Sequence, residues 1–586
     1  MAAKSSPPEQ LSVCESEGAL TWRGVRNAAL VVAMAFILTK CNSEGGVFDI
    51  LRLGSGFTAK TICSGVFVSH RTRDSLWYEL GGSDKLLDLF FSKVTNTTTE
   101  KSVTSSFLGL GFFSAEARYR GMPLGCYVVH PSQPPPPDYS PPLAASGGGS
   151  KPLASDLNAA IQELLSYEFT DEAFRANQTR AVVVLHKGKV VGEGYQTRLL
   201  GIGPATRLLG WSMTKTVHAM VVGAAMGGVA IAGKPSEGDN EDEEDSRSAN
   251  NDSGPLATTS PLRLSLDSPV ELADLEITHL EELLTVNGGK NITFRDLLGM
   301  SDLLGMREVY SMGGDVPRML FLEPDAAKFA ATIRNRVPLS PAKCDRRATA
   351  HYYPFGWYYS SGMSNVLAKE FRRQFPTTQA YYTFVLHDVL SKIGSSFVFE
   401  TDAAGTFVAS SFLYATALDF ARVGMTILAS RVGRGRFGGL VSGDSGEDGG
   451  LRLPDREFAT HLQTPHPHSG GIYSASASVW LNPSRVSLHA HYCALNHSPD
   501  RRARFRWMAQ TLPRDCLSLE GYQGQFVLVC PSLELVVVRL GLTPGKVDHP
   551  TASDFEHSED AENGYSKSRL IGGIIQRLGL TWKEPK

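Results

Sequence analysis

The chain has 586 residues, of which 42% are hydrophobic and 20% charged, and its formal net charge is -3. The hydrophobic fraction is sufficient for a large buried core, which excludes a mostly disordered chain. Lys+Arg total 57 and Asp+Glu 60, so no basic excess is present to neutralise phosphates, and nucleic acid is not expected as a partner. At about 150 residues per domain, this length corresponds to roughly four domains. Glycine and proline are clustered, however, and we interpret the clusters as loops within fewer domains.

The amino end contains an uninterrupted apolar run, AALVVAMAFIL, at residues 28–38, preceded by two arginines. As a helix the run spans about 16 Å, about half of the hydrocarbon core of a bilayer, so it is short for a transmembrane span. Its length fits the h-region of a secretory signal. We therefore predict that residues 1–45 are a leader with a signal or signal-anchor, which implies the secretory pathway and membrane association through 28–38. Acidic residues upstream and the lack of a small-x-small cleavage pattern leave a buried helix in an intracellular protein as the alternative.

The next segment, 46–130, is predicted to pack on the main domain of the chain. A linker follows it over 131–156. The first part of the linker, PSQPPPPDYSPP at 131–142, has polyproline II character and cannot join a helix or a central strand. The second part, AASGGGS at 144–150, is typical of a flexible connection.

The main domain is predicted to span 157–586 and to carry two loop insertions. The first insertion, 234–262, includes the acidic run EGDNEDEEDSRSANNDSG, whose self-repulsion favours an exposed loop. The second insertion, 433–450, is rich in glycine and charged residues. Without the leader, linker and insertions, one large domain remains.

Hydrophobic patterns between these loops predict regular elements. Valine-rich runs on both sides of Lys187 and Gly188 indicate a hairpin, and apolar residues at helical spacing after Ser212 indicate a helix. In chain order we predict a hairpin at 181–195, helices at 212–226 and 411–428, strands at 526–530 and 533–541, and a final helix at about 566–578. Strands near both ends with helices between them predict an α/β (α+β) fold, in which helices flank an antiparallel sheet and a further region is all-helical.

The eight cysteines are scattered, and no two have the C-x-x-C spacing of a zinc or thioredoxin-like site. Cys63 and Cys126 can pair in an oxidising compartment. We favour the alternative that the cysteines are buried free thiols, because free cysteine is among the residues most often buried.

The first candidate for chemistry is GWSMTK at 210–215, which opens a predicted helix with Ser212 and Lys215. A serine and a lysine three residues apart lie on one helix face, one turn from each other. The lysine can accept the hydroxyl proton if burial lowers its pKa. The amino end of the helix also offers N–H groups to a developing oxyanion. Alone, this pattern is more often a helix N-cap followed by a solvated lysine.

The second candidate is YSSG at 359–362, with Tyr359 and Ser361. A tyrosine beside the serine and lysine can relay a proton, especially if the lysine charge favours the phenolate. The alternative is an aromatic core cluster, because several aromatic residues precede the motif.

The third candidate is GYQGQ at 521–525, directly before a predicted strand. A glycine such as Gly524 lets a substrate approach the backbone closely. The backbone N–H of Gln525 can then donate to an oxyanion. The alternative is an ordinary glycine turn.

With these three motifs in this order, the chain resembles the serine β-lactamase/penicillin-binding-protein superfamily. Within it, the chain is most similar to class C-like serine hydrolases of the esterase and 6-aminohexanoate-dimer hydrolase type. The supporting stretches cover most of 180–545 and include LLGWSMTKT, WYYSSGMSN and GYQGQFVLVCPSLELVVVRLG. The segment AKTICSGVFVSHR at 59–71 also resembles an amino-terminal strand region of the family. The resemblance implies a β-lactamase/transpeptidase-like fold.

The resemblance also implies roles for the motif residues. Ser212 would be the acylated nucleophile and Lys215 its general base. Tyr359 would relay the proton and help to protonate the leaving group. The backbone N–H groups of Ser212 and Gln525 would form the oxyanion hole.

Two positions depart from the family pattern. Tyr522 stands where relatives carry lysine or histidine, which removes a cationic partner for a substrate carboxylate. Ser361 stands where β-lactamases place an asparagine amide. Both departures favour an esterase or amidase over an efficient β-lactamase, with Tyr522, Gly524 and Ser361 as expected substrate contacts.

The sequence therefore predicts a metal-independent serine hydrolase that cleaves a small-molecule ester or amide without a cofactor. The run GVAIAGK at 228–234 is not read as a phosphate-binding loop, because Pro235 replaces the required hydroxyl residue. Histidines between 461 and 491 are interpreted as surface or core residues, not metal ligands. The alternatives left open are a weak or inactive binding or scaffold protein of the same fold, an acyl transferase, and a β-lactamase. The oligomeric state is also left open.

Overall fold

The structure is a computed structural model, and it describes eight stretches of the chain. They are 46–142 without 74 and 77–88, 152–226, 264–271 with 275, 291–332 without 302, 303, 305, 311 and 312, 357–432, 460–482 without 468 and 470, 512–543, and 567–582. The predicted leader and both predicted loop insertions lie outside the described residues. The predictions about them therefore stay predictions.

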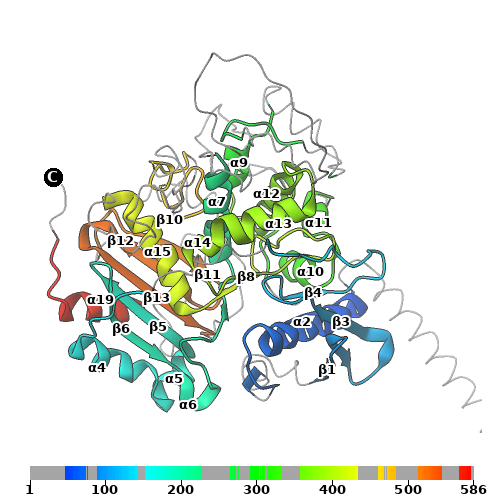
Figure 1. Cartoon of the computed structure of the whole chain (residues 1–586), viewed down its shortest axis with the longest axis horizontal. Helices are drawn as coiled ribbons and strands as arrows, with labels where there is room; N and C mark the ends of the chain where they lie inside the picture. The colour runs from blue at the N-terminus through cyan, green and yellow to red at the C-terminus, as the bar shows by residue number, and fades with distance from the viewer. Residues whose placement is uncertain are drawn as a thin grey trace, which may run out of the picture.

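A six-stranded antiparallel sheet forms the centre of the main domain (Figure 1). Its strands are β5 (Thr179–His186), β6 (Lys189–Tyr195), β10 (Trp480–Leu481), β11 (Leu517–Gly521), β12 (Gln525–Cys530) and β13 (Leu535–Gly541). The strand order is β10-β11-β12-β13-β5-β6, so β13 near the carboxyl end pairs with β5 near the start of the domain.

The predicted hairpin and the two predicted strands near the carboxyl end are confirmed, and these two strands also pair as a hairpin. Lys187 and Gly188 connect β5 to β6 with φ values of 50° and 78°, the left-handed backbone that a tight hairpin turn requires. A short turn over Pro531–Leu533 connects β12 to β13. Strands β12 and β13 are buried along their whole length, and β5 is buried up to its last residue, whereas β6 is buried only at residues 190–192.

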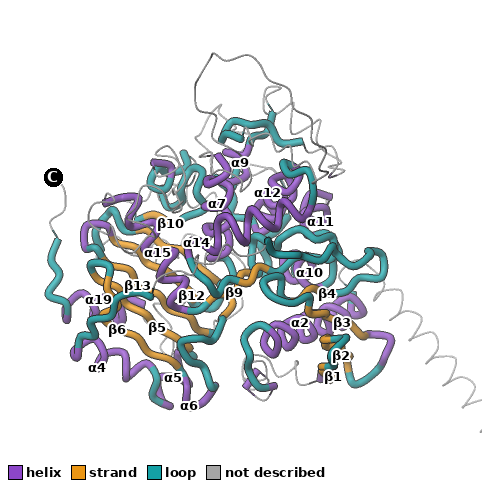
Figure 2. The backbone as a smooth tube through the Cα atoms, in the orientation of Figure 1, coloured by secondary structure: helices purple, strands orange, loops and turns teal. Residues whose placement is uncertain are grey.

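Helices cover both faces of this sheet, which explains why its strands are apolar on both sides. One face packs against α4 (Ala159–Glu168) and α19 (Lys567–Arg577). The other face packs against α15 (Ala417–Val432) and α7 (Met213–Met226) (Figure 2). Since side chains alternate along a strand, the cores on the two faces draw on alternate residues of β5 and β12. The predicted helices at 212–226 and 566–578 are α7 and α19.

The predicted helix at 411–428 is wrong at its beginning. Residues Leu413–Ala415 form β9, which pairs with β7 (Leu208–Leu209) and β8 (Val398–Phe399), and α15 begins only at Ala417. A short apolar run fits a buried strand as well as a helix, and here pairing with two distant strands decides the outcome. The Thr416 hydroxyl accepts a hydrogen bond from the Asp419 N–H at 3.1 Å and marks the start of α15.

A helical region lies beside α7, on the side away from the six-stranded sheet (Figure 2). Its helices are α9 (Phe294–Leu298), α10 (Asp315–Phe321), α11 (Ala326–Thr332), α12 (Ser361–Arg373), α13 (Thr378–Tyr382) and α14 (Ser391–Ile393). The amino end of α7 thus lies at the junction between the sheet and this region. The predicted class, mixed helices with antiparallel sheets, is confirmed.

The segment before the main domain forms a unit of one helix and one sheet. Helix α2 (Val47–Phe67) packs on a four-stranded antiparallel sheet of β1 (Phe90–Asn96), β2 (Lys101–Phe107), β3 (Ser114–Tyr119) and β4 (Cys126–Val128). The strand expected within 59–71 from family resemblance is wrong, because this stretch is largely part of α2. Buried Ala59, Ile62, Cys63 and Phe67 recur at helical spacing and face the sheet.

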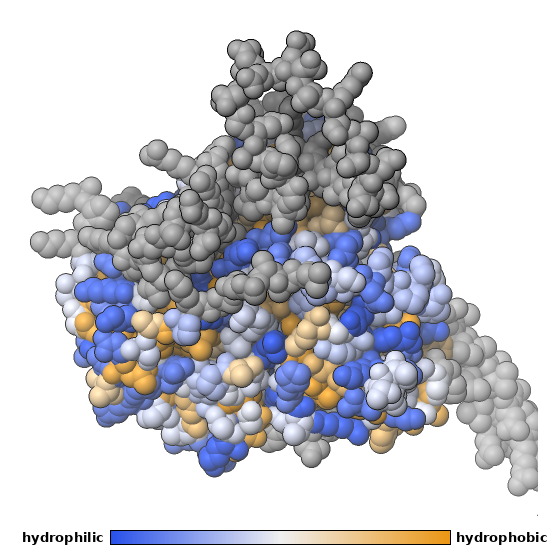
Figure 3. Space-filling model, viewed as in Figure 1, coloured by the Kyte–Doolittle hydropathy of each residue, from blue (hydrophilic) through white to orange (hydrophobic). Residues whose placement is uncertain are grey.

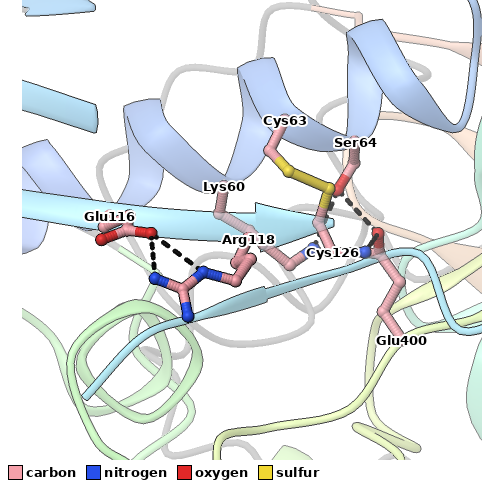
Figure 4. The surroundings of a disulfide bond; sticks show 7 residues. All are labelled: Lys60, Cys63, Ser64, Glu116, Arg118, Cys126 and Glu400. Carbon is pink, nitrogen blue, oxygen red and sulfur yellow. Dashed lines mark hydrogen bonds and ion pairs between the residues drawn. A yellow bond between two sulfur atoms is a disulfide. The ribbon is translucent and has the colours of Figure 1, made fainter. Parts of the chain in front are cut away.

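A buried ion pair joins this unit to the main domain (Figure 4). The Lys60 ammonium contacts the Glu400 carboxylate, and both side chains are buried. The same carboxylate accepts hydrogen bonds from the Ser64 hydroxyl at 2.8 Å and from the Cys126 N–H at 2.7 Å. The Lys60 ammonium also lies 4.1 Å from the centre of the Phe412 ring. The partners of the Glu400 carboxylate therefore come from α2 and β4 of the amino-terminal unit.

The proline-rich stretch 131–142 forms neither helix nor strand, as its composition predicted. It nevertheless makes specific contacts with its surroundings. The Pro137 carbonyl accepts a hydrogen bond from Arg120, and the Tyr139 ring lies edge-on to Tyr382 with centroids 6.1 Å apart. This part of the linker thus lies against α13.

Two disulfides are present, Cys63–Cys126 and Cys516–Cys530. The preference for free thiols is therefore wrong for these four residues, and the second pair was not predicted; the other four cysteines lie outside the described residues. Disulfides are typical of proteins that fold in an oxidising, extracytoplasmic compartment.

Within the described ranges, no helix combines the length and the apolar character needed to cross a membrane. On the face seen in Figure 3, hydrophilic and hydrophobic residues alternate over the described surface.

Candidate active site

Ser212 and Lys215 meet at the amino end of α7. Ser212 directly precedes the helix, and the Lys215 N–H donates to the Ser212 carbonyl at 3.1 Å, so both residues belong to the first turn. This turn directs the Lys215 ammonium toward the Ser212 hydroxyl, with Nζ and Oγ 2.8 Å apart. Trp211 has a φ of 47°, a left-handed conformation that is strained for a large side chain. The sharp turn before the helix therefore presents Ser212.

Lys215 is enclosed by oxygen atoms and is only 2% exposed. Its ammonium donates to the hydroxyls of Ser212 and Ser361, the latter at 3.1 Å, and to the Ser410 carbonyl at 3.1 Å. Burial lowers the pKa of Lys215 to about 8, while the nearby Glu308 charge acts in the opposite direction. At mildly alkaline pH the lysine is therefore largely neutral and can accept a proton.

Tyr359 lies beside the lysine, with its ring centre 4.8 Å from Lys215 Nζ. Burial raises the pKa of Tyr359 well above its usual value, and the neighbouring Tyr473 and Glu308 raise it further. A hydrogen bond with Ser212 lowers the pKa but does not offset burial. Tyr359 is thus a phenol at neutral pH, and the phenolate considered from the sequence is not favoured. The phenol suits the role of proton donor.

Tyr359 also belongs to an aromatic cluster, the alternative considered from the sequence. Its ring centre lies 5.3 Å from that of Trp480 and 6.0 Å from that of Tyr473. Packing and proton transfer are compatible, because the packed rings fix the phenol beside Ser212.

Glu308, a buried carboxylate that holds Ser361, was not among the predicted site residues. The N–H and the hydroxyl of Ser361 donate to its two oxygens at 2.7 and 2.5 Å. The Tyr310 hydroxyl donates to the same carboxylate at 2.6 Å, and the Glu308 N–H donates to the Tyr358 hydroxyl at 2.9 Å. Ser361 therefore links Lys215 to a fixed negative charge. No spacing rule identifies Glu308, and its only signal in the sequence is a lone acid in the stretch GMREVY.

Ser410 is the second residue that the sequence did not reveal. Its carbonyl accepts from Lys215, and its orientation is fixed by Asn365 of α12. The Ser410 N–H donates to Asn365 Oδ1 at 3.1 Å, and Asn365 Nδ2 donates to the Ser410 hydroxyl at 3.2 Å. The loop that carries Ser410 begins near Glu400, so the ion pair with the amino-terminal unit supports the same loop.

The end of β11 and the first residue of the turn that follows it contact Gly210 and Trp211, which directly precede Ser212. Gly521 lies so close to the Gly210 carbonyl that a Cβ atom would collide with it. Next to it, the Tyr522 ring lies edge-on to the Trp211 ring with centroids 5.8 Å apart. Tyr522 is thus brought beside Ser212.

The later residues of the turn are directed toward β13. Gly524, with a φ of 80°, accepts a hydrogen bond from Arg539 at 2.7 Å through its carbonyl. The Gln525 side chain accepts from the Gly541 N–H at 2.9 Å and donates to the carbonyls of Gly541 and Tyr522. Any contribution of Gln525 to the site therefore comes from its backbone.

The histidines at 461–491 are only partly described. His466 is buried, with its Nε2 atom 3.4 Å from the Ser301 hydroxyl. His468, His489 and His491 lie outside the described residues. In the part of the chain that the structure describes, no group of three or more histidine, cysteine or acidic side chains is arranged to hold a metal ion.

Several solved structures are similar to this chain at low sequence identity. A "putative 6-aminohexanoate-dimer hydrolase" from Bacillus anthracis is 17% identical, with a TM-score of 0.40, and the match covers 75% of this chain and 89% of that one. A "family VIII carboxylesterase" is 11% identical, with a TM-score of 0.41 and coverages of 73% and 99%. A "novel penicillin-binding protein homolog" from Caulobacter crescentus is 13% identical, with a TM-score of 0.40 and coverages of 73% and 99%.

No protein-family model and no curated protein matches the chain. The solved structures named above share a likeness of fold with the chain at low identity, and this likeness assigns no activity to it. The proposal for a function therefore rests mainly on the geometry of the site.

Proposed function

We propose that the chain is a serine hydrolase that cleaves an ester or amide through an acyl-enzyme on Ser212. The observation that carries this proposal is the 2.8 Å contact between the Ser212 hydroxyl and a buried lysine with a lowered pKa. A solvated lysine after a helix N-cap, the alternative weighed from the sequence, has neither burial nor three oxygen partners.

Acylation begins when neutral Lys215 takes the hydroxyl proton of Ser212. The Ser212 Oγ atom forms a bond to the substrate carbonyl carbon, and the negative charge moves to the carbonyl oxygen. We assign the stabilising donors to the backbone N–H groups of Ser212 and Gln525. The bond to the leaving group then breaks, and the leaving group takes a proton from Tyr359, which regains one from Lys215.

Hydrolysis of the acyl-enzyme reverses these proton movements. A water molecule attacks the acyl carbon, loses its proton to the Lys215 and Tyr359 pair, and Ser212 Oγ leaves as the hydroxyl. Water activation by Tyr359 alone is less favourable, because the raised pKa keeps Tyr359 protonated. Lys215, with a pKa of about 8, is the better base at neutral pH.

The residues around the nucleophile favour simple esters or amides over β-lactams. Tyr522 offers an aromatic ring where relatives carry a cation. The Ser361 hydroxyl donates its hydrogen bond to Glu308, so this hydroxyl does not serve as a donor to the substrate. An acyl transferase follows from the same intermediate if an amine or alcohol replaces water.

The test is turnover of a p-nitrophenyl ester by the wild type, two variants of the site and two control variants. Lys215→Ala should lower kcat by about 10²–10⁴-fold, the usual contribution of a general base. Ser212→Ala should reduce turnover to the uncatalysed background. Lys189→Ala and Ser166→Ala replace an exposed lysine and an exposed serine, and should retain full activity. Wild-type protein that neither hydrolyses an ester or amide nor forms an acyl-transfer product would favour the binding or scaffold alternative.

A further inference from the structure

Three aromatic rings lie side by side next to the proposed nucleophile. Trp211 immediately precedes Ser212, and its ring is nearly perpendicular to that of Tyr522, at an angle of 83°. Tyr310 stacks on Tyr522 with centroids 5.3 Å apart and an interplanar angle of 20°. These rings come from three separate chain segments, and we refer to Trp211, Tyr310 and Tyr522 as the aromatic surface.

The protein fixes the orientation of this surface. Tyr310 is held through its hydroxyl, which donates to Glu308 at 2.6 Å, and Glu308 is held in turn by Ser361. The position of Tyr522 is restricted by its chain neighbour Gly521, whose backbone lies against the Gly210 carbonyl. A surface ordered before binding loses little entropy when a ligand arrives.

Exposure distinguishes the aromatic surface from the rest of the site. Lys215 and Tyr359 are buried, whereas all three rings are partly exposed. Aromatic side chains contribute a large apolar area at low entropic cost, and planar groups stack on them favourably. Their faces carry partial negative charge, and Glu308 adds a negative charge at the Tyr310 hydroxyl. An anionic group is therefore disfavoured here.

We infer that Trp211, Tyr310 and Tyr522 form a subsite that binds a planar apolar group of the substrate, so that neutral aryl esters or amides are preferred over substrates that place a carboxylate there. This inference rests on the proposed function, because it describes one side of the same site. It assigns Tyr522 to specificity, and it leaves the chemical step to Ser212 and Lys215.

The experiment compares three ethyl esters that share one leaving group, so that only the acyl group differs. They are ethyl phenylacetate, ethyl butyrate and monoethyl succinate, with hydrolysis followed by pH-stat titration. The kcat/KM of the wild type should be at least about tenfold higher for the aryl ester than for the aliphatic one, which corresponds to about 1.4 kcal/mol. The anionic ester should be the poorest substrate. Benzyl acetate tests whether the aryl group binds from the leaving-group side.

Variants at Tyr522 separate binding from chemistry. Tyr522→Ala should raise KM for the aryl ester about tenfold and lower kcat/KM for the aryl ester more than for ethyl butyrate. Tyr522→Lys should increase kcat/KM for monoethyl succinate and lower it for the aryl ester. Tyr167→Ala is the matched control, because Tyr167 is an exposed tyrosine on α4, and it should change no parameter.

The experiment distinguishes failure of the proposed function from failure of the aromatic subsite. If Ser212→Ala hydrolyses ethyl butyrate as fast as the wild type, the proposed function is wrong. If Ser212→Ala is inactive but Tyr522→Ala affects all esters equally, the hydrolase assignment stands and the aromatic subsite is wrong. A wild type that prefers the aliphatic or the anionic ester, with benzyl acetate no better, overturns the subsite as well.

Discussion

Replacement of Glu308 by glutamine should shift the pH dependence of the reaction in a direction that the structure specifies. The negative charge of Glu308 raises the pKa of Lys215 against the effect of burial. Removing the charge should therefore lower the pKa of Lys215, so that the lysine stays neutral to lower pH. The acid limb of kcat/KM should move to lower pH in Glu308→Gln.

The size of this shift follows from the geometry. The hydrogen bonds of 3.1 Å and 2.5 Å through Ser361 place the Glu308 oxygen no farther than about 5.6 Å from Lys215 Nζ. At an effective dielectric constant of about 20, the two charges interact by roughly 3 kcal/mol, which corresponds to about two pH units. Relaxation around the new amide reduces the effect, so we expect a shift of about one to two pH units.

The fraction of Lys215 that is neutral at pH 6 changes enough to make this shift measurable. With a pKa of about 8, about 1% of Lys215 is neutral at pH 6 in the wild type. After the shift, about 10–50% is neutral at the same pH. The plateau rate should fall, because glutamine cannot accept hydrogen bonds from both Ser361 donors.

The assay is kcat/KM for a neutral ester between pH 5 and 10. Tyr310→Phe is the matched control, because it removes one hydrogen bond to Glu308 but keeps the charge, and its acid limb should stay in place. Circular dichroism verifies that each variant is folded. An acid limb of Glu308→Gln that stays in place or moves to higher pH would refute the assignment of Lys215 as the base under the influence of Glu308.

Three further predictions address the proton donor, the backbone contact and the domain junction. Tyr359→Phe should lower kcat by about 100-fold or more with little change in KM, and unchanged turnover would reduce Tyr359 to a packing role. Gly521→Ala should abolish ester hydrolysis, because its Cβ would collide with the Gly210 carbonyl; full activity would contradict the close contact of the two backbones. Glu400→Gln leaves Lys60 buried without its counter-charge and should lower the free energy of unfolding by about 3–5 kcal/mol in urea titrations. A loss below about 1 kcal/mol would show that Glu400 does not hold the amino-terminal unit in place.

Much of the core of the main domain could be predicted because its signals are local. Val183 and Val184 belong to an apolar run that a turn at Lys187 and Gly188 follows, which is sufficient to predict a hairpin. Ser212 and Lys215 are three residues apart, so helix geometry alone brings them together. Local spacing thus accounts for the central pair of the site.

The rest depends on contacts between distant residues, which spacing does not encode. Lys215 meets Ser361 and Ser410 across sequence separations of 146 and 195 residues, and Ser361 meets Glu308 across 53. Family resemblance supplied the motif that contains Ser361, but nothing in the sequence indicated Glu308. The strand β9 was missed for the same reason, since pairing with β7 and β8 decided its conformation.

The cysteine prediction failed for a different reason. Cys516 and Cys530 lie 14 residues apart in β-rich sequence, and only the antiparallel pairing of β11 with β12 brings them together. Composition alone favoured free thiols, because eight cysteines are few for a chain of this length. The pairing of strands, not the cysteine count, determined the disulfide.

The central claim is that the Ser212 hydroxyl is the nucleophile, and covalent trapping tests it most directly. The full chain would be treated with a fluorophosphonate, and the modified residue would be identified by peptide mass mapping. We predict one adduct on the peptide that contains Ser212 and no adduct in Ser212→Ala or after prior treatment with substrate. An adduct on Ser361 or Ser410, or equal labelling of the wild type and Ser212→Ala, would contradict the claim.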